Sequence, residues 1–483
     1  MKTKTSILLL GALLALAGDT ARAAPEVAAS ALTPDEIRTI DAIAAAELKR
    51  FNAPGMVLLL LRGDSVVCRT AYGVANIETG EPMTPELMVS VGSVTKTVTA
   101  ITALALAAEG KLDLDAPVRT YLPWLPPRLG AVNMVQLLSH TAGLGDQVPL
   151  IGPNPIDGSM APVAKAMNDD SALAPPGTVF AYTNQGYVLA GAVIEAVGGA
   201  PYAQVVRKTL LKPLGMTRST FDPRVAMTYR HAQGHDPSGA QPAVLRPFNS
   251  FPHWMPAGEL ITTVDDLARL ARALLADGVL DGKRVLPAGI LARMAAPRTR
   301  GIGNFGNSRF DYGMGLMLRE HHGLRIVEHH GFHLGFGACF CLVPERGLAA
   351  IAVGNGRGCF PLRTAQAGLE SAAGVTLEWT DATTRPLPPA DANAALGRYG
   401  NGAPAQTIEI ALTDGAVVLR QGKDSYPIAV RDDGVWEIPG YRPFLPLPAT
   451  PIELLPTEPG KPPTYLRFGW RLFQRMDPAS KTP

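Results

Sequence analysis

One apolar stretch, residues 94–108, constrains the fold of this chain more than any other feature of the sequence. Its apolar residues keep helical spacing, and Gly110 follows as a stop signal. Alanine and leucine fill much of the remaining circumference, which predicts a helix that is buried on nearly all sides. Such a helix needs other elements packed around it, so it belongs at the centre of a large core.

Strand-like segments lie on both sides of the helical part of the sequence. Residues 56–61 and 66–70 flank Gly63-Asp64, which predicts a hairpin. Residues 264–276 have helical spacing after two threonines, and the period becomes strand-like again over residues 325–354. This order of elements predicts an α+β fold in which helices flank an antiparallel sheet.

The composition changes between residues 380 and 396, where proline, alanine, threonine and aspartate dominate, and this stretch is expected to be a linker. Alternating apolar residues after it are separated by the turn signals Asp414-Gly415 and Asp433-Gly434. We therefore expect a large domain over residues 24–379 and a small antiparallel β domain over residues 397–483. The β domain is either an interaction module or a cover for one edge of the large domain.

The N-terminal segment resembles a targeting signal. Lys2 and Lys4 precede an apolar run over residues 7–17, and Ala21-Arg22-Ala23 supplies small residues for signal peptidase, which predicts a signal peptide over residues 1–23. The run is too short to span a bilayer, and no later segment has about twenty consecutive apolar residues. A secreted or periplasmic protein with no stable membrane anchor after cleavage is expected.

Charge and cysteine content exclude two classes of protein. Lys and Arg number 44 against 42 Asp and Glu, which gives no basic excess for binding nucleic acid. Four cysteines in 483 residues do not make a disulfide framework. Cys339 and Cys341 alternate in an expected strand and should share a face as buried thiols. The sequence does not decide whether one disulfide forms among the four cysteines.

A possible nucleophile stands at the start of the apolar helix. Ser93 and Lys96 form the Ser-x-x-Lys pattern, which occurs once in the chain. Side chains at i and i+3 leave the same helix face, so the amine can lie beside the hydroxyl. A serine hydroxyl needs such a neighbour to accept its proton before it can attack a carbonyl. The alternative is a helix cap followed by a surface lysine.

Other catalytic patterns are missing from the sequence. Gly-x-Ser-x-Gly, His-Glu-x-x-His and paired Cys-x-x-Cys do not occur. Five histidines between His321 and His333 alternate along a strand or turn instead of sharing a helix face. We therefore expect no metal site and no organic cofactor, and the roles of His330 and His333 stay open.

Several segments in one order resemble the serine β-lactamase and penicillin-binding-protein-like hydrolases, a family with class C β-lactamases, DD-peptidases, D-aminopeptidases and esterases. The resemblance covers most of residues 34–374. The matching segments are Ala71-Tyr72-Gly73-Val74-Ala75-Asn76, Val91-Gly92-Ser93-Val94-Thr95-Lys96, Leu112-Asp113-Leu114-Asp115-Ala116-Pro117, Leu137-Leu138-Ser139-His140-Thr141-Ala142-Gly143-Leu144, Phe180-Ala181-Tyr182-Thr183-Asn184-Gln185-Gly186-Tyr187, Pro213-Leu214-Gly215-Met216 and Pro256-Ala257-Gly258-Glu259-Leu260. It implies a sheet flanked by helices together with an all-helical subdomain.

The resemblance also implies roles for individual residues. Tyr182 and Asn184 match the family's Tyr-x-Asn element, in which the tyrosine shares proton transfer with the lysine and the amide binds lysine and substrate. His329 and Gly331 match its Lys-Thr-Gly strand in the form His-x-Gly, and the N–H groups of Ser93 and Phe332 would form the oxyanion hole. The second Tyr-x-Asn, at Tyr399, lies outside the match and is expected to play no part. His140 lies inside a matching segment and is expected to be structural.

These residues together predict a serine hydrolase that forms an acyl-enzyme on Ser93. The substrate is a small molecule or peptide with a reactive amide or ester carbonyl. Histidine at position 329 is mostly neutral at pH 7, where the family's lysine carries a charge, which favours a D-amino-acid peptidase (DD-carboxypeptidase-like) or an esterase over a β-lactamase. A penicillin or cell-wall-peptide sensor without turnover is the alternative from another class, and the oligomeric state is left open.

Overall fold

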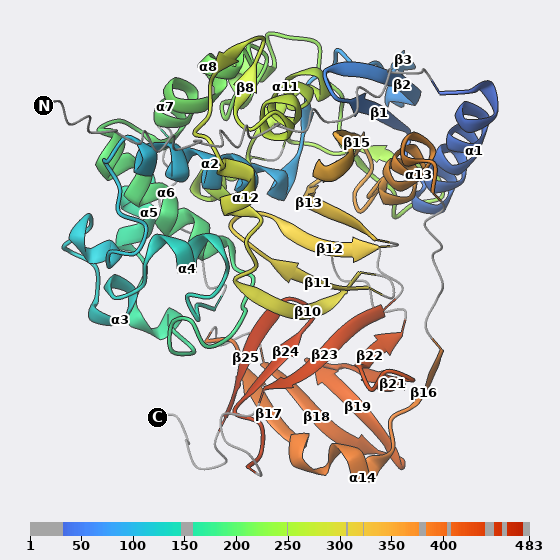
Figure 1. Ribbon diagram of the computed structural model, residues 1–483. Coiled ribbons are helices and arrows are strands. Elements are labelled where there is room, and N and C mark those ends of the chain that lie inside the picture. The colour runs from blue at the N-terminus through green and yellow to red at the C-terminus, as the bar shows by residue number, and fades with distance from the viewer. Residues whose placement is uncertain are drawn as a thin grey trace, which may run out of the picture.

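The computed structural model describes residues 32–145, 158–248, 250–305, 308–321, 323–375, 383–402, 407–439, 449–455 and 461–476. The expected signal peptide, residues 1–23, lies outside the described residues. Two large antiparallel sheets dominate the described part, one above the other in Figure 1. The predicted α+β fold with a separate β unit is confirmed.

The first sheet has nine strands in the order β10-β11-β12-β13-β14-β15-β1-β2-β3. Its strands are β1 Gly55–Arg62, β2 Ser65–Asn76, β3 Glu81–Pro82, β10 Thr299–Phe305, β11 Ser308–Tyr312, β12 Met317–His321, β13 Leu324–His333, β14 Phe336–Val343 and β15 Leu348–Gly354. Strands β1 and β15 pair at its centre, so segments from the two ends of the domain meet there. The helical part of the chain is inserted between them.

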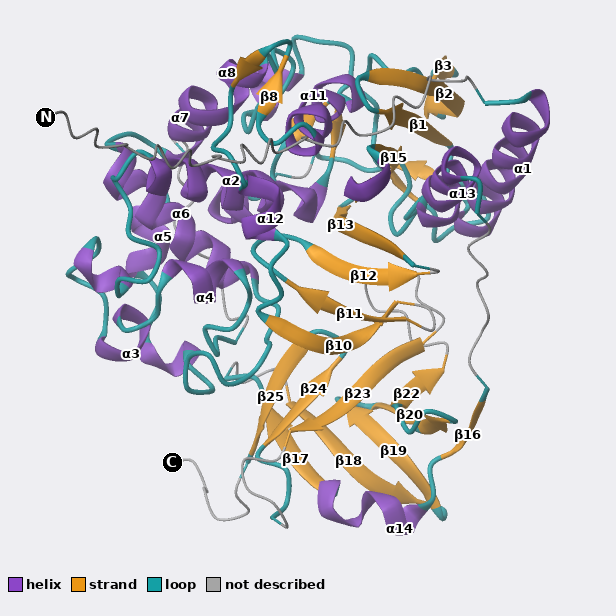
Figure 2. Cartoon of the chain, viewed as in Figure 1, coloured by secondary structure: helices purple, strands orange, loops and turns teal. Residues whose placement is uncertain are grey.

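Helices cover both faces of this sheet (Figure 2). They are α1 Pro34–Phe51, α2 Thr95–Ala108, α3 Pro127–Gly130, α4 Met134–Leu138, α5 Ala161–Lys165, α6 Asn184–Gly198, α7 Tyr202–Val206, α8 Lys212–Leu214, α9 Pro223–Ala226, α10 Met255–Gly258, α11 Val264–Leu275, α12 Ile290–Met294 and α13 Leu362–Ala373. Helices α1 and α13 pack on one face against Leu58 and Leu60. Helix α11 packs on the other face, against Val57 and Leu59.

Helix α2 is the central helix that the apolar stretch predicts. Its residues from Thr95 to Leu106 are all buried, and Gly110 follows with a positive φ of 72°. The polar groups on it are satisfied inside the core: the hydroxyl of Thr99 donates to the carbonyl of Pro256, and that of Thr97 to the carbonyl of Gly315. Burial on all sides therefore fixes this helix, and the residues at its N-terminus, in place.

The second sheet has ten strands in the order β16-β21-β22-β23-β24-β25-β17-β18-β19-β20. Its strands are β16 Thr384–Pro386, β17 Gly397–Gly400, β18 Thr407–Thr413, β19 Ala416–Gln421, β20 Asp424–Pro427, β21 Ala429–Arg431, β22 Trp436–Pro439, β23 Ala449–Leu455, β24 Tyr465–Phe468 and β25 Arg471–Arg475. The stretch expected to be a linker, residues 380–396, contains β16 and the short helix α14 Pro389–Ala392, and β16 pairs with β21 in this sheet. Tyr399 is fully buried in the core of this sheet.

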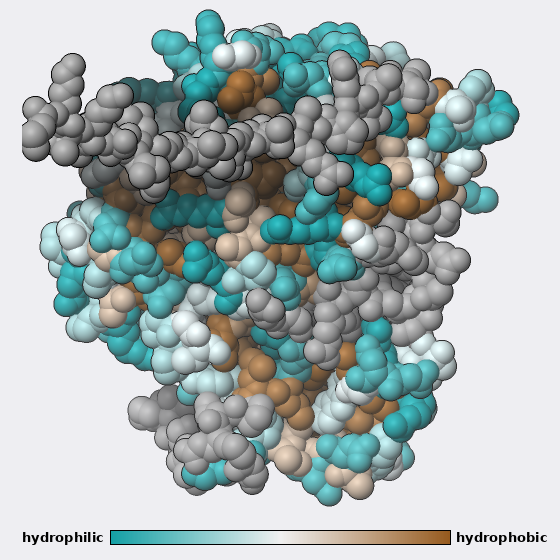
Figure 3. All heavy atoms as spheres, in the orientation of Figure 1, coloured by the Kyte–Doolittle hydropathy of each residue, from teal (hydrophilic) through white to brown (hydrophobic). Residues whose placement is uncertain are grey.

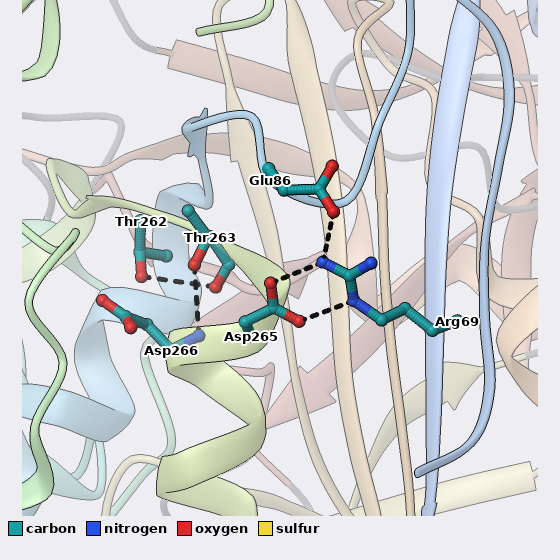
Figure 4. Close-up of polar contacts among 6 residues, drawn as sticks. All are labelled: Arg69, Glu86, Thr262, Thr263, Asp265 and Asp266. Atoms are coloured by element: carbon teal, nitrogen blue, oxygen red, sulfur yellow. Dashed lines mark hydrogen bonds and ion pairs between the residues drawn. The ribbon is translucent and has the colours of Figure 1, made fainter. Parts of the chain in front are cut away.

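A polar cluster joins the edge of the first sheet to the start of helix α11 (Figure 4). The guanidinium of Arg69, on β2, donates to both carboxylate oxygens of Asp265 at 2.9 and 2.8 Å and to Glu86 at 2.7 Å. Thr263 caps the same helix by accepting a hydrogen bond from the N–H of Asp266. Just before this cap, β7 Ile261–Thr262 pairs with β4 Val89–Ser90, which leads into the turn that carries Ser93.

Polar and apolar residues share the surface of the protein. On the face drawn in Figure 3, apolar and polar residues interleave over the second sheet. Leu412 and Met476 of the C-terminal unit are exposed to 45% and 38%. Among the described residues, no single helix is long and apolar enough to cross a membrane, and only the bent pair Asn184–Gly198 and Tyr202–Leu214 passes that test together.

Candidate active site

Ser93 lies in a short turn that ends against the first residue of α2. The turn Gly92–Val94 is a single 3₁₀ turn, and Gly92 needs its positive φ of 51° to form it. Ser93 is half-buried, whereas the rest of the turn is buried. The hydroxyl is therefore held at the mouth of the central helix while one side of it stays open.

Lys96 lies one helical turn further on and is completely buried. Its Nζ is 3.1 Å from Ser93 Oγ, 2.8 Å from Asn184 Oδ1 and 2.8 Å from the carbonyl oxygen of Ala257. Such a set of acceptors offsets the cost of placing an amine in the core. The same contacts fix the amine beside the serine hydroxyl.

Tyr182 lies on the other side of this amine, two residues before Asn184, where α6 begins. Its ring centroid is 4.8 Å from Lys96 Nζ and 5.9 Å from the guanidinium carbon of Arg471. Both side chains therefore lie within cation–π range of this ring. The backbone N–H of Tyr182 donates to the carbonyl of Trp470, and its carbonyl accepts from Arg471 Nη1 at 3.2 Å. Two consecutive residues of the second sheet therefore hold the tyrosine in place.

The ring of His140 packs against the ring of Tyr182. The two rings lie 4.2 Å apart between centroids, and His140 Nδ1 accepts a hydrogen bond from the N–H of Thr183. Burial, with the charge of Lys96 as a smaller effect, lowers the pKa of His140 well below its ordinary value, so this ring is neutral. The backbone of His140 has a positive φ of 58°, which is rare outside glycine. The expected structural role of His140 is therefore a specific one, the positioning of Tyr182.

Strand β13 passes close to the serine turn because two glycines face each other. A Cβ on Gly331 would lie 1.8 Å from the carbonyl oxygen of Val91 and 3.1 Å from the backbone nitrogen of Ser93. A Cβ on Gly92 would lie 2.3 Å from the carbonyl oxygen of Phe332. Only glycine permits this approach, which brings the backbone of Phe332 next to that of Ser93, as the expected oxyanion hole requires.

His329 lies behind this centre and is 1% exposed. Its Nε2 is 2.9 Å from the hydroxyl of Tyr312, and its Nδ1 is 2.7 Å from the carbonyl oxygen of His330. Burial, assisted by the charge of Lys96, lowers the pKa of His329 to about 3. The ring is neutral at physiological pH, so position 329 supplies no cation for a substrate carboxylate.

The other histidines of this region have separate surroundings. His333 Nε2 lies 3.1 Å from Glu259 Oε1. Burial is the largest single effect on the pKa of this histidine and lowers it, but the charge of Glu259 and the hydrogen bonds to Glu259 and Leu334 together raise the pKa. His330 points to the opposite face of the sheet, where Glu328 and Cys341 complete a group that could hold a metal ion. The side chain of His321 and all of His322 lie outside the described residues.

The structure brings Ser93, Lys96, Tyr182 and Asn184 together, with Gly331 and Phe332 beside them and His329 behind. Sequence reasoning missed the contributions of Ala257, Tyr312, Trp470 and Arg471. Ala257 and Trp470 act through backbone carbonyls. Every residue has such a carbonyl, so no sequence pattern predicts these two contacts. Arg471 follows Ser93 by several hundred residues, and only the fold brings it near.

The sequence matches the family model described as Beta-lactamase over residues 40–373. Penicillin-binding protein 4 of Amycolatopsis lactamdurans is 30% identical over 317 residues, which are 63% of this chain and 81% of that protein. The family match covers Ser93, Lys96 and Tyr182 and most of the first domain.

Solved structures extend the likeness to both sheets. SurE with D-Leu is 26% identical, with a TM-score of 0.72, and the match covers 92% of this chain and all of that one. The D-amino acid amidase of Ochrobactrum anthropi SV3 shares the fold at 22% identity, with a TM-score of 0.59, over 70% of this chain and 99% of that one.

Proposed function

This chain belongs to the Beta-lactamase family of serine hydrolases, and we propose that it is an exported acyl-hydrolase for peptides that contain D-amino acids, or for simple esters. One observation carries the proposal: Lys96 Nζ, fully buried, lies 3.1 Å from Ser93 Oγ and is held there by Asn184 and Ala257. An amine in this position can accept the serine proton as the oxygen attacks a carbonyl carbon.

The proposed reaction has two steps. Ser93 Oγ adds to the carbonyl carbon, its proton passes to Lys96 or Tyr182, and the N–H groups of Ser93 and Phe332 stabilise the oxyanion. The same proton then goes to the leaving amine or alcohol, and an acyl-enzyme remains. Water gives up a proton to this pair, attacks the ester, and releases the carboxylic acid together with the free serine.

Two observations support a peptidase or esterase over a β-lactamase. His329 is buried and neutral, with both ring nitrogens engaged by protein atoms, so it lacks the charge that a β-lactam carboxylate would meet there. SurE, a solved structure whose match covers 92% of this chain, is described with D-Leu. A D-configured residue on one side of the scissile bond is therefore the first substrate to test.

The test compares three substrates on the purified chain without residues 1–23. They are a D-Ala-D-Ala peptide, a short-chain p-nitrophenyl ester and a chromogenic cephalosporin, each with Ser93→Ala as control. We expect turnover of the peptide or the ester that Ser93→Ala abolishes. Turnover of the cephalosporin alone would replace the proposal by a β-lactamase, and a fluorescent penicillin that labels Ser93 without any turnover would replace it by a sensor.

Export is a separate part of the proposal. It follows from the targeting pattern in residues 1–23. Fractionation of cells that produce the chain, followed by N-terminal sequencing, should recover it outside the cytoplasm and beginning near Ala24. Recovery in the cytoplasm with Met1 intact would contradict this part alone.

A further inference from the structure

A square of polar side chains lies on the face of the sheet opposite His329. In the register of β13 and β14, Glu328 pairs with Cys341 and His330 pairs with Cys339. Because side chains alternate along a strand, these four share one face, while His329 points to the other. Their exposed fractions are between 0% and 4%. The proposed reaction uses none of them.

Three of these side chains aim one ligand atom each at the same point. Glu328 Oε2 lies 3.3 Å from His330 Nε2 and 3.3 Å from Cys341 Sγ. The three ligand atoms all lie within 4.8 Å of one another. Bonds of about 2.0–2.3 Å to a tetrahedral zinc ion place neighbouring ligand atoms roughly 3.3–3.8 Å apart. The spacing is therefore close to that of a zinc site.

Cys339 lies beside the other ring nitrogen of His330, Nδ1. Its Sγ lies 3.3 Å from His330 Nδ1. In the tautomer with the proton on Nδ1, Nδ1–H donates to this sulfur and Nε2 presents its lone pair on the side of Glu328 Oε2, which is the form of the ring that binds a metal.

Charge and donor type favour a borderline soft divalent metal. Arg319 contacts both carboxylate oxygens of Glu328, Oε1 through Nε at 2.5 Å and Oε2 through Nη2 at 3.3 Å, and Oε2 also faces His330 and Cys341. A thiol, an imidazole and a carboxylate form a donor set that suits zinc and does not suit magnesium or calcium. Binding would displace the proton of Cys341, so that a thiolate and a carboxylate face the two positive charges of the metal and the one of Arg319.

We propose that Glu328, His330 and Cys341 form a zinc-binding site on the back of β13, with Cys339 orienting the imidazole. We expected no metal from the sequence, because the histidines alternate and no carboxylate or thiol has matching spacing. The register of β13 and β14 places Glu328 and Cys341 beside His330. The site is one residue from His329 and on the same strand as Phe332, so an ion would stiffen the strand that forms the oxyanion hole. Its role is structural, because the enclosed site does not touch Ser93.

The first experiment uses the wild-type chain. It is loaded with zinc sulfate, desalted and analysed for metal by mass spectrometry, with magnesium chloride as the parallel sample. We expect about one zinc per chain and no retained magnesium. Cobalt(II) should give thiolate-to-cobalt absorption in the near ultraviolet, which excess zinc removes. Absence of both the zinc and the cobalt signal overturns the proposal.

The second experiment assigns the ligands. Cys341→Ala should weaken zinc binding at least tenfold and remove the cobalt absorption, whereas Cys359→Ala, another fully buried cysteine outside the square, should leave both unchanged. Equal zinc binding by Cys341→Ala and the wild type overturns the proposal. Should circular dichroism show that Cys341→Ala is unfolded, His330→Gln takes its place with the same expected loss. Ser93→Ala should bind zinc like the wild type, which separates this result from the proposed hydrolysis.

Discussion

The backbone N–H of Tyr182 donates a 2.9 Å hydrogen bond to the carbonyl of Trp470, so a strand hairpin of the second sheet holds a residue of the serine centre. The two rings also meet, with centroids 5.3 Å apart. At this contact the β domain packs on the large domain and supports Tyr182. A role of the β domain as an interaction module stays a prediction.

Removal of the Trp470 ring should therefore impair catalysis at a distance. Trp470→Ala leaves the backbone hydrogen bond but removes contacts to Tyr182 and Phe310. We expect kcat to fall about ten- to a hundredfold, because a shift of about 1 Å in a proton-transfer group has that effect. Steady-state kinetics on the best substrate measure it. Leu412→Ala, at an exposed site on the same sheet, is the control and should change nothing.

Lys96 should matter for the reaction and little for the fold. Lys96→Met keeps the length and apolar stem of the side chain but removes the amine that contacts Ser93, Asn184 and Ala257. A fall in kcat of about 10²–10⁴-fold is expected, the usual contribution of a proton-transfer group. Lys111→Met removes a lysine of a surface ion pair and serves as the matched control. Retention of more than half the activity by Lys96→Met would remove the basis for the proton-transfer assignment.

Gly331 should be irreplaceable even by alanine. The added Cβ of Gly331→Ala would meet the carbonyl of Val91 at 1.8 Å and push β13 away from Ser93. We expect a loss in kcat of at least about a hundredfold, comparable with the removal of one oxyanion donor. Gly400→Ala, in a strand where the new Cβ would meet its nearest neighbour at 3.4 Å, tests the effect of the substitution itself. Similar kinetics for both variants would argue against the close approach of β13.

The buried neutral His329 should make stability depend on acidity. Its pKa is lowered to about 3 in the folded chain, against about 6.5 when unfolded. Above pH 6.5 the ring is neutral in both states, and the stability is fully present. As the pH falls from about 6.5 toward 3, this histidine binds a proton in the unfolded chain but stays neutral in the folded chain. The free energy of unfolding therefore decreases by about 1 kcal/mol per pH unit.

Urea unfolding of wild type and His329→Asn between pH 7 and pH 4 measures this dependence. The variant should lose stability less steeply on the acid side, although it is less stable at pH 7 because Tyr312 loses its partner. Parallel slopes for His329→Asn and the wild type would mean that the ring is protonated in the folded chain.

Local pattern was sufficient for much of this fold. Helical spacing over residues 94–108 predicted α2, and Gly63-Asp64 between apolar runs predicted the hairpin of β1 and β2. Alternation after residue 407 predicted the strands of the second sheet. In each case the signal lies within one element, so no knowledge of tertiary contacts is needed.

The serine centre could be predicted only where side chains carry the signal. Ser93 and Lys96 are neighbours because helix geometry places i and i+3 on one face. The carbonyl of Ala257 and the contacts of Trp470 depend on how distant segments meet. The same holds for Glu328 and Cys341, which strand register brings together, and for His329, whose neutrality depends on burial.

The contact between Tyr182 and the hairpin at Trp470 also has a consequence in time. A ribosome adds Ser93 and Lys96 long before it reaches Trp470, so a growing chain carries its nucleophile for most of its synthesis without the contacts that hold its partner tyrosine. A growing chain therefore lacks the contacts that hold Tyr182 until the turn at Trp470 has been made and has docked.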